Sequence, residues 1–205
     1  MNSLTHAANE KYRKLGFEIG KGCRIWGAID KNCVCVSMGS YSTLGSGSYI
    51  ATHCPVRGIS VDKLRTVIEK DVWIGYRSSI TPGTYIGRRC IVGMASVVSG
   101  ELSKDSIYVG NPVRRIRLRN PIETVKTRLY TMQNLTCIPN HRPMWNLTRD
   151  IIVDVFEDLL DDGLDIEDLD FLYNGEFCYD ILHKGIKLED NIYDTIFMLK
   201  RMYKK

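Results

Sequence analysis

Several features that would assign a chain of this size to a particular class are missing from the sequence. Its 205 residues contain no run of about 18 apolar residues, so no transmembrane helix is expected. Residues 1–16 lack the continuous apolar stretch of a signal peptide. The seven cysteines are scattered and form no C-x-x-C pair, which argues against a disulfide framework or a zinc site. We therefore expect a cytoplasmic protein with reduced thiols, no membrane insertion and no bound metal.

Charge is spread unevenly along the chain, although the formal net charge is only +4. Residues 1–120 contain 18 Lys and Arg against 8 Asp and Glu, whereas residues 121–205 contain 10 against 16. A basic first part suits an anionic ligand. The change of sign predicts a domain boundary near residue 120, with an acidic helical region over 121–205 after it. Before it we expect a main domain over 17–120, preceded by a helical lead-in over 1–16. In that last region, apolar residues at helical spacing predict helices near 151–162, 176–184 and 189–202.

A six-residue repeat organises the main domain. An aliphatic residue recurs at every sixth position, first at Met38, Leu44 and Ile50, and then at Ile68, Ile74, Ile80, Ile86, Val92 and Val98. Six residues make one short strand and a corner, so three repeats close a triangular coil and residues 18 apart stack in an apolar column. The period is interrupted over 55–66, which predicts a loop leaving the coil.

Two further positions of the repeat carry a pattern. The residue after each aliphatic is small in most repeats, as at Gly75 and Gly87, and we expect it at a corner, where a Cβ or a negative φ would obstruct the turn. Trp73 is also expected at a corner. The fourth residue after each aliphatic is small or modest in size and is expected to point inward. This makes Cys54 and Cys90 core thiols rather than nucleophiles.

The ordered motifs resemble those of one family. The segments Val72-Trp73-Ile74-Gly75, Ile91 to Val98, and Val109-Gly110-Asn111-Pro112-Val113-Arg114 look like those of the hexapeptide-repeat acyltransferases, nearest to the branch that acetylates sugars, small alcohols and some antibiotics. The resemblance covers residues 17–119. It implies a mainly β fold, a left-handed parallel β-helix, and a homotrimer with active sites between subunits.

One histidine lies within the repeats. His53 closes a repeat immediately before the 55–66 loop, whereas His6, His141 and His183 lie outside. Imidazole suits the removal of a proton from an attacking oxygen. The segment Thr52-His53-Cys54-Pro55-Val56 resembles the family's histidine segment, which implies that His53 is a general base. The implied reaction moves an acetyl group from acetyl-CoA directly to a hydroxyl or amino group of a sugar, free or nucleotide-linked.

The same resemblance implies the residues that hold the coenzyme. By position, Gly75, Ser78, Met94 and Ala95 would line the pantetheine arm. Relatives often place a lysine shortly after Val-Val, where this chain has Ser99-Gly100-Glu101, so Lys104 or the arginines would take over the phosphates. Guanidinium groups suit phosphates well, which favours Arg114, Arg115 and Arg117 as phosphate ligands. Two alternative roles stay open for these arginines, exposure to solvent on the last coil or a salt bridge within the trimer.

Three other functions can be weighed against this hypothesis. A γ-class carbonic anhydrase needs three histidines around zinc, and one histidine in the repeats excludes that site. Nucleic-acid binding is disfavoured because the arginines are not interleaved with stacking aromatic residues. A catalytically inactive β-helix that docks through its helical tail stays open, although the histidine and the Gly-Asn-Pro-basic ending argue against it.

Overall fold

The computed structural model describes residues 3–31, 35–53 and 65–119, together with residues 123, 124, 127, 146, 147, 187 and 188. Contacts divide the chain into two units, of which Ser3–Thr127 form the first. In the second unit, Asn146–Leu147 (β16) and Lys187–Leu188 (β17) form a parallel pair. The helices predicted near 151–162, 176–184 and 189–202 lie outside the described residues, and the domain boundary near residue 120 stays a prediction.

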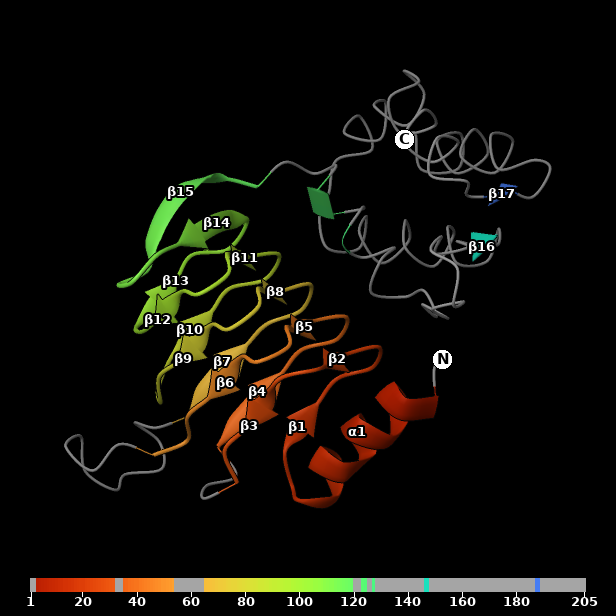
Figure 1. Cartoon of the computed structure of the whole chain (residues 1–205). Coiled ribbons are helices and arrows are strands. Elements are labelled where there is room, and N and C mark those ends of the chain that lie inside the picture. Colours follow the sequence, from red (N-terminus) through yellow and green to blue (C-terminus); the bar gives the residue numbers. More distant parts are fainter. Residues whose placement is uncertain are drawn as a thin grey trace, which may run out of the picture. The chain divides into compact units, whose positions relative to one another are not determined.

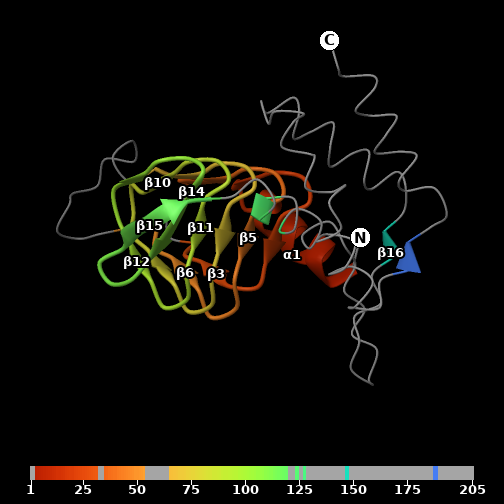
Figure 2. The ribbon, with the colours of Figure 1, turned by 90° about the horizontal axis from the view of Figure 1, so that it is seen from above.

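The first unit is a parallel β-helix with three faces (Figures 1 and 2). The first face contains Glu18–Ile19 (β1), Val36–Met38 (β4), Thr66–Ile68 (β7), Tyr85–Ile86 (β10) and Glu101–Leu102 (β13). The second contains Arg24–Ile25 (β2), Thr43–Leu44 (β5), Trp73–Ile74 (β8), Ile91–Val92 (β11), Ser106–Val109 (β14) and Arg114–Leu118 (β15). The third contains Ala28–Ile29 (β3), Tyr49–Ile50 (β6), Ser79–Ile80 (β9) and Val97–Val98 (β12). All pairs are parallel except β14 with β15, so the predicted fold class is confirmed.

The predicted apolar columns form the core of this coil. Ile68 pairs with Ile86, Ile74 with Val92, and Ile80 with Val98, each 18 positions apart. All nine aliphatic residues of the repeat are at most 1% exposed. Because each buried aliphatic side chain of this size contributes about 1.5–3 kcal/mol, the columns supply most of the stabilisation of the coil.

The interruption of the repeat is visible as a jump in register. Ile50 pairs with Ile80, thirty positions further on, where an uninterrupted coil would pair residues 18 apart. The loop therefore leaves the coil without disturbing the stacking on either side of it. The strand β7 resumes at Thr66, the last residue assigned to the loop from the sequence. Cys54 and residues 55–64 lie outside the described residues.

The small residue after each aliphatic has a different cause from the one expected. A Cβ on Gly75 would lie 2.7 Å from the backbone nitrogen of Met94 in the next coil, and one on Gly87 would lie 2.6 Å from that of Lys104. Neither glycine has a positive φ. Most positive φ values of the coil fall two residues later, at Tyr41, Gly47, Asp71, Arg77, Gly83, Arg89, Ala95 and Asp105, whereas after Val98 the positive φ lies at Gly100. Stacking of successive coils thus excludes the Cβ, and the turn itself is made at the third residue after most of the aliphatics.

Trp73 also differs from expectation, because it lies in a strand and not at a corner. It is the first residue of β8, where it pairs with Thr43 on one side and Ile91 on the other. Its side chain is half-buried, and Thr43 beside it is fully buried. Trp73 is therefore a half-buried strand residue of the second face.

The helix Ser3–Lys14 (α1) lies against the first coil (Figure 1). Three side chains attach it. Asn9 donates to the Cys23 carbonyl at 2.8 Å, Arg13 donates to the Ile19 carbonyl at 2.8 Å, and the Ile29 amide donates to the Tyr12 hydroxyl at 3.2 Å. In the part of the chain that the structure describes, no helix is long and apolar enough to cross a membrane.

Candidate functional site

His53 lies beside a buried carboxylate that the sequence analysis did not identify. Its partner Asp30 follows β3, and His53 follows β6. These strands are paired with Ile29 opposite Ile50, so the residues after them meet at the corner between the third and first faces. There, Nδ1 of His53 lies 2.6 Å from Oδ2 of Asp30.

The two groups of this pair differ in exposure. The Asp30 side chain is 6% exposed, whereas that of His53 is 53% exposed. Thr52 adds a second hydrogen bond, from Oγ1 to Oδ2 of Asp30 at 2.9 Å. The pKa of Tyr49 is raised, first by partial burial and then by the negative charge of Asp30. A carboxylate held in this way fixes the ring of an imidazole that stays open to solvent.

The pair has a definite chemical consequence. An ionised carboxylate only accepts hydrogen bonds, so the neutral imidazole of His53 donates from Nδ1. Nε2 is then the ring atom with a free lone pair, and it can take a proton from an approaching hydroxyl or amine. A buried carboxylate also stabilises the imidazolium that forms when it does so. The arrangement is that of a general base and its orienting group.

The corner between the second and third faces carries three of the predicted coenzyme residues. The Gly75 amide donates to the Val92 carbonyl at 2.8 Å, which fixes the stacking at this corner. Met94 is 72% exposed and Ala95, which has φ 55°, is exposed beside it. These exposed residues form an apolar edge that an extended ligand chain could follow.

Ser78 has a different environment from the one expected for a coenzyme contact. Its side chain is turned into the coil and is 1% exposed. The hydroxyl donates to the Gly93 carbonyl at 3.0 Å, and the Ser78 amide donates to Ser48 Oγ at 3.1 Å. Ser78 thus satisfies backbone groups of neighbouring coils, and its side chain cannot reach a ligand outside the coil.

The residues predicted to bind the phosphates of the coenzyme lie on the last coil. Lys104 is exposed at the corner between the first and second faces. Arg114, Arg115 and Arg117 are exposed on β15, the edge strand of the second face. Arg117 forms a bidentate ion pair with Glu123 at 2.7 and 2.8 Å, and this hydrogen bonding raises its pKa. Arg114 and Arg115 make no ion pair with a carboxylate of the described residues, which favours them as ligands of an anion.

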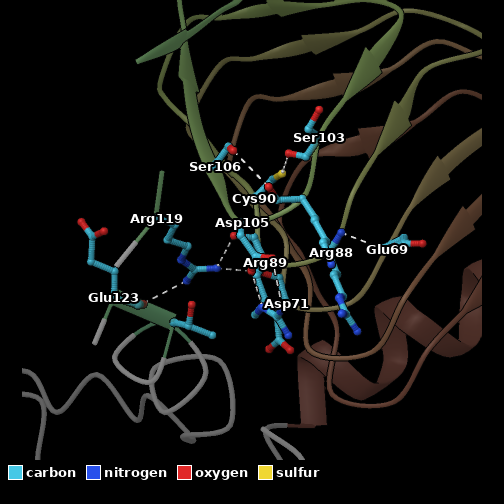
Figure 3. A network of polar contacts seen from close by, with 12 residues as sticks. Glu69, Asp71, Arg88, Arg89, Cys90, Ser103, Asp105, Ser106, Arg119 and Glu123 are labelled. Atoms are coloured by element: carbon cyan, nitrogen blue, oxygen red, sulfur yellow. Dashed lines mark hydrogen bonds and ion pairs between the residues drawn. The ribbon is translucent and has the colours of Figure 1, made fainter. Parts of the chain in front are cut away.

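Arg119 is buried, unlike the other arginines of this stretch. Its guanidinium donates to the carbonyl oxygens of Asp71 at 3.1 Å, Arg89 at 2.8 Å and Glu123 at 2.9 Å (Figure 3). Burial lowers its pKa to about 10. Arg119 therefore ties three backbone segments together at the end of the coil and is not available to a ligand.

Cys90 belongs to the same polar network (Figure 3). Its Sγ is fully buried and donates to the Ser103 carbonyl at 3.0 Å. Burial raises the pKa of the thiol to about 11, so the expectation of a core thiol is confirmed. Beside it, Nε of Arg89 and Oδ1 of Asp105 form an ion pair at 2.5 Å. Within the described ranges no group of three His, Cys, Asp or Glu side chains is placed to hold a metal ion.

Comparison with known proteins identifies the family to which the repeats belong. The family described as bacterial transferase hexapeptide (six repeats) matches residues 65–100. The similarity extends further to protein CapG of Staphylococcus aureus, which is 32% identical over 129 residues, 57% of this chain and 74% of that protein. The chain belongs to the hexapeptide-repeat transferase family.

Other relatives match over shorter regions. Chloramphenicol acetyltransferase of Klebsiella aerogenes is 36% identical over 31% of this chain and 30% of its own length. A putative lipopolysaccharide biosynthesis O-acetyl transferase of Escherichia coli is 33% identical over 30% of this chain and 31% of its own length. The chain spans between 22% and 30% of the first curated relatives that it matches. A solved hexapeptide-repeat acetyltransferase of Vibrio cholerae in complex with acetyl-CoA is 24% identical, with a TM-score of 0.42, over 57% of this chain and 79% of its own.

Proposed function

We propose that this hexapeptide-repeat transferase moves an acetyl group from acetyl-CoA to a hydroxyl group of a sugar. The observation that carries the proposal is the exposed imidazole of His53 bonded through Nδ1 to the buried carboxylate of Asp30. Nε2 of His53 takes the proton of the acceptor hydroxyl as its oxygen attacks the thioester carbonyl carbon. The tetrahedral intermediate collapses with loss of the coenzyme A thiolate, which takes the proton back from the imidazolium.

Asp30 is a positioning residue in this scheme. Its carboxylate keeps the proton of the neutral imidazole on Nδ1 and stabilises the positive ring during transfer. No covalent enzyme intermediate is needed, because coenzyme A is already a good leaving group. The buried thiol of Cys90, with its pKa raised to about 11, is in keeping with this direct transfer.

The residues of the last coils fit the coenzyme in part. The exposed Met94 and Ala95 supply an apolar edge for the pantetheine arm, and Gly75 permits the close stacking beneath it. The guanidinium groups of Arg114 and Arg115 are exposed and suit the phosphates. Lys104 and the paired Arg117 are secondary contacts in this proposal. The Ser78 side chain is not among the coenzyme ligands in this proposal, because it points into the coil.

The location of these groups supports a site shared between copies of the chain. Within one chain the third face separates His53 at one of its corners from Met94 and Ala95 at the other. A homotrimer, in which one subunit's histidine meets its neighbour's coenzyme edge, would bring them together.

Such sharing is testable by mixing two inactive variants, His53→Ala and Ala95→Asp. Random mixing would restore about a quarter of the sites, and separate sites in each subunit would restore none.

A sugar hydroxyl is the acceptor that we favour. The lipopolysaccharide O-acetyl transferase among the relatives is consistent with that class, and a positioned base helps a hydroxyl more than an amine. The direct test is release of free thiol from acetyl-CoA in the presence of sugars, amino sugars and their nucleotide conjugates, followed by the mass of the product. A gain of one acetyl group on oxygen supports the proposal. Absence of both turnover and acetyl-CoA binding would favour an inactive β-helix, and acetylation of nitrogen alone would correct the acceptor.

A further inference from the structure

A basic cavity lies between helix α1 and the first coil, and one of its lining residues is the neighbour of Asp30 in the sequence. Its volume is about 540 Å³, and it is lined by Glu10, Lys11 and Lys14 of α1, by Leu15 directly after the helix and by Lys31 of the first coil. Three of these five side chains are lysines. All three lysines are exposed at the surface of the cavity, so their ammonium groups can meet a ligand from solvent.

The cavity is connected to the proposed active site through the backbone. Lys31 directly follows Asp30, so their Cα atoms are about 3.8 Å apart. The helix is held at the same place, because the Tyr12 hydroxyl accepts a hydrogen bond from the Ile29 amide at 3.2 Å. Lys11 and Lys14 flank Tyr12 on α1. The backbone that carries the lysines is therefore held in place relative to the carboxylate that bonds His53.

The charge of the cavity is positive and is not neutralised locally. Its one acidic residue, Glu10, forms an ion pair with Arg13 at 2.8 Å. Within residues 3–31, 35–53 and 65–119, no carboxylate forms an ion pair with any of the three lysines. The end of α1 contributes a partial charge of about −0.5, which three ammonium groups exceed. A cavity with this excess of positive charge suits an anion that carries two or more negative charges.

We infer that this lysine cavity binds a phosphate or diphosphate group of the acceptor, so that the acceptor is a phosphorylated or nucleotide-linked sugar. This inference rests on the proposed function, since it places the sugar hydroxyl next to His53 and its phosphate at the lysines. The exposed side chain of Leu15 supplies an apolar surface at the rim of the same cavity. A neutral sugar would make none of the charge-assisted contacts.

The experiment measures binding alone and does not depend on turnover. Glucose, glucose 1-phosphate, pyrophosphate and UDP-glucose are titrated calorimetrically into the wild type and into Lys11→Gln/Lys14→Gln/Lys31→Gln. We expect the anions to bind the wild type, and the triple variant to bind them about tenfold more weakly or worse. Lys21→Gln removes an exposed lysine of the same coil at another corner, and it should bind as the wild type does. Comparing glucose 1-phosphate with UDP-glucose distinguishes a single phosphate from a diphosphate.

The outcomes separate this inference from the proposed function. Equal binding by the wild type and the triple variant, or no binding of any anion by the wild type, would overturn the lysine site even if the protein acetylates neutral sugars. His53→Ala should bind the anions as the wild type does, because the imidazole does not line the cavity. Loss of anion binding in the triple variant, in a protein that releases no thiol from acetyl-CoA, would support the cavity and contradict the transferase.

Discussion

Replacement of Asp30 by asparagine tests the proposed role of the buried carboxylate. The side chain keeps its shape, and its amide oxygen can still accept from Nδ1 of His53, but the negative charge is lost. In the wild type that charge lies 2.6 Å from the ring nitrogen, and the Asp30 side chain is only 6% exposed. The variant should fold with its coil intact and should fail to stabilise the imidazolium.

The size of the effect follows from the charge interaction. Two unit charges about 4 Å apart interact by about 4 kcal/mol at an effective dielectric constant of about 20. The imidazole is half-exposed, so solvent screening reduces this to roughly 1.5–3 kcal/mol. Each 1.36 kcal/mol is about a factor of ten in rate, so kcat should fall by roughly 10- to 100-fold. The KM for acetyl-CoA should change little, because the buried Asp30 carboxylate contacts the His53 ring and is not a coenzyme contact in this proposal.

The assay combines kinetics with nitrogen NMR of the histidine ring. Thiol release gives kcat and KM, and the ¹⁵N shifts report which ring nitrogen carries the proton. We expect the Asp30→Asn variant to lose the uniform Nδ1–H form. A matched control is Thr52→Val, which removes the hydrogen bond from Thr52 Oγ1 to the same carboxylate at 2.9 Å and leaves the imidazole contact in place. It should cost about 1 kcal/mol of stability and leave kcat within threefold. An unchanged kcat in Asp30→Asn would refute the reasoning.

Three further predictions concern stability and reactivity. Gly75→Ala places a Cβ 2.7 Å from the Met94 amide nitrogen, so urea unfolding should show a loss of about 1–3 kcal/mol, and no loss would contradict the close stacking. Arg119→Leu leaves buried carbonyl oxygens without donors and should cost about 2–4 kcal/mol, whereas loss of the exposed ion pair in Arg117→Gln should change stability far less; equal losses of stability would be evidence against the network. Cys90, whose pKa is raised from 9.0 to about 11, should react with iodoacetamide at pH 9 far more slowly in the folded protein than in urea, and its labelling should rise as the pH approaches 11. Rapid labelling of the folded protein at pH 9, seen by peptide mass spectrometry, would contradict its burial.

The fold could be predicted from the sequence because the repeat encodes it directly. A coil of three six-residue sides requires the aliphatic residue at one fixed position, and Ile68, Ile74 and Ile80 satisfy that requirement without any knowledge of contacts. The corners were harder to place. Positive φ values occur at Tyr41, Arg77 and Arg89, whose residue types give no signal for a left-handed turn. Only the stacked backbone shows which position turns.

The candidate site could be predicted in part for a similar reason. His53 is the one histidine in the repeats, so composition and resemblance were enough to single it out. Asp30 was missed because the first coil departs from the regular period. Its strand β3 pairs Ile29 with Ile50, which are 21 positions apart and not 18, so the spacing alone does not place Asp30 beside His53. The inward orientation of Ser78 was predictable from its position in the repeat, since it is the fourth residue after Ile74.

The most direct test of the central claim compares His53→Ala with the wild type in thiol release from saturating acetyl-CoA. Loss of a general base should lower kcat by roughly 10²–10⁴-fold. The dissociation constant for acetyl-CoA, measured separately by calorimetry, should stay within about twofold, since His53 in this proposal acts on the acceptor hydroxyl and does not belong to the coenzyme edge. That combination would establish His53 as the base of an acetyltransferase. Turnover by His53→Ala within about threefold of the wild-type rate would contradict the account, because the proposed mechanism assigns removal of the proton to His53.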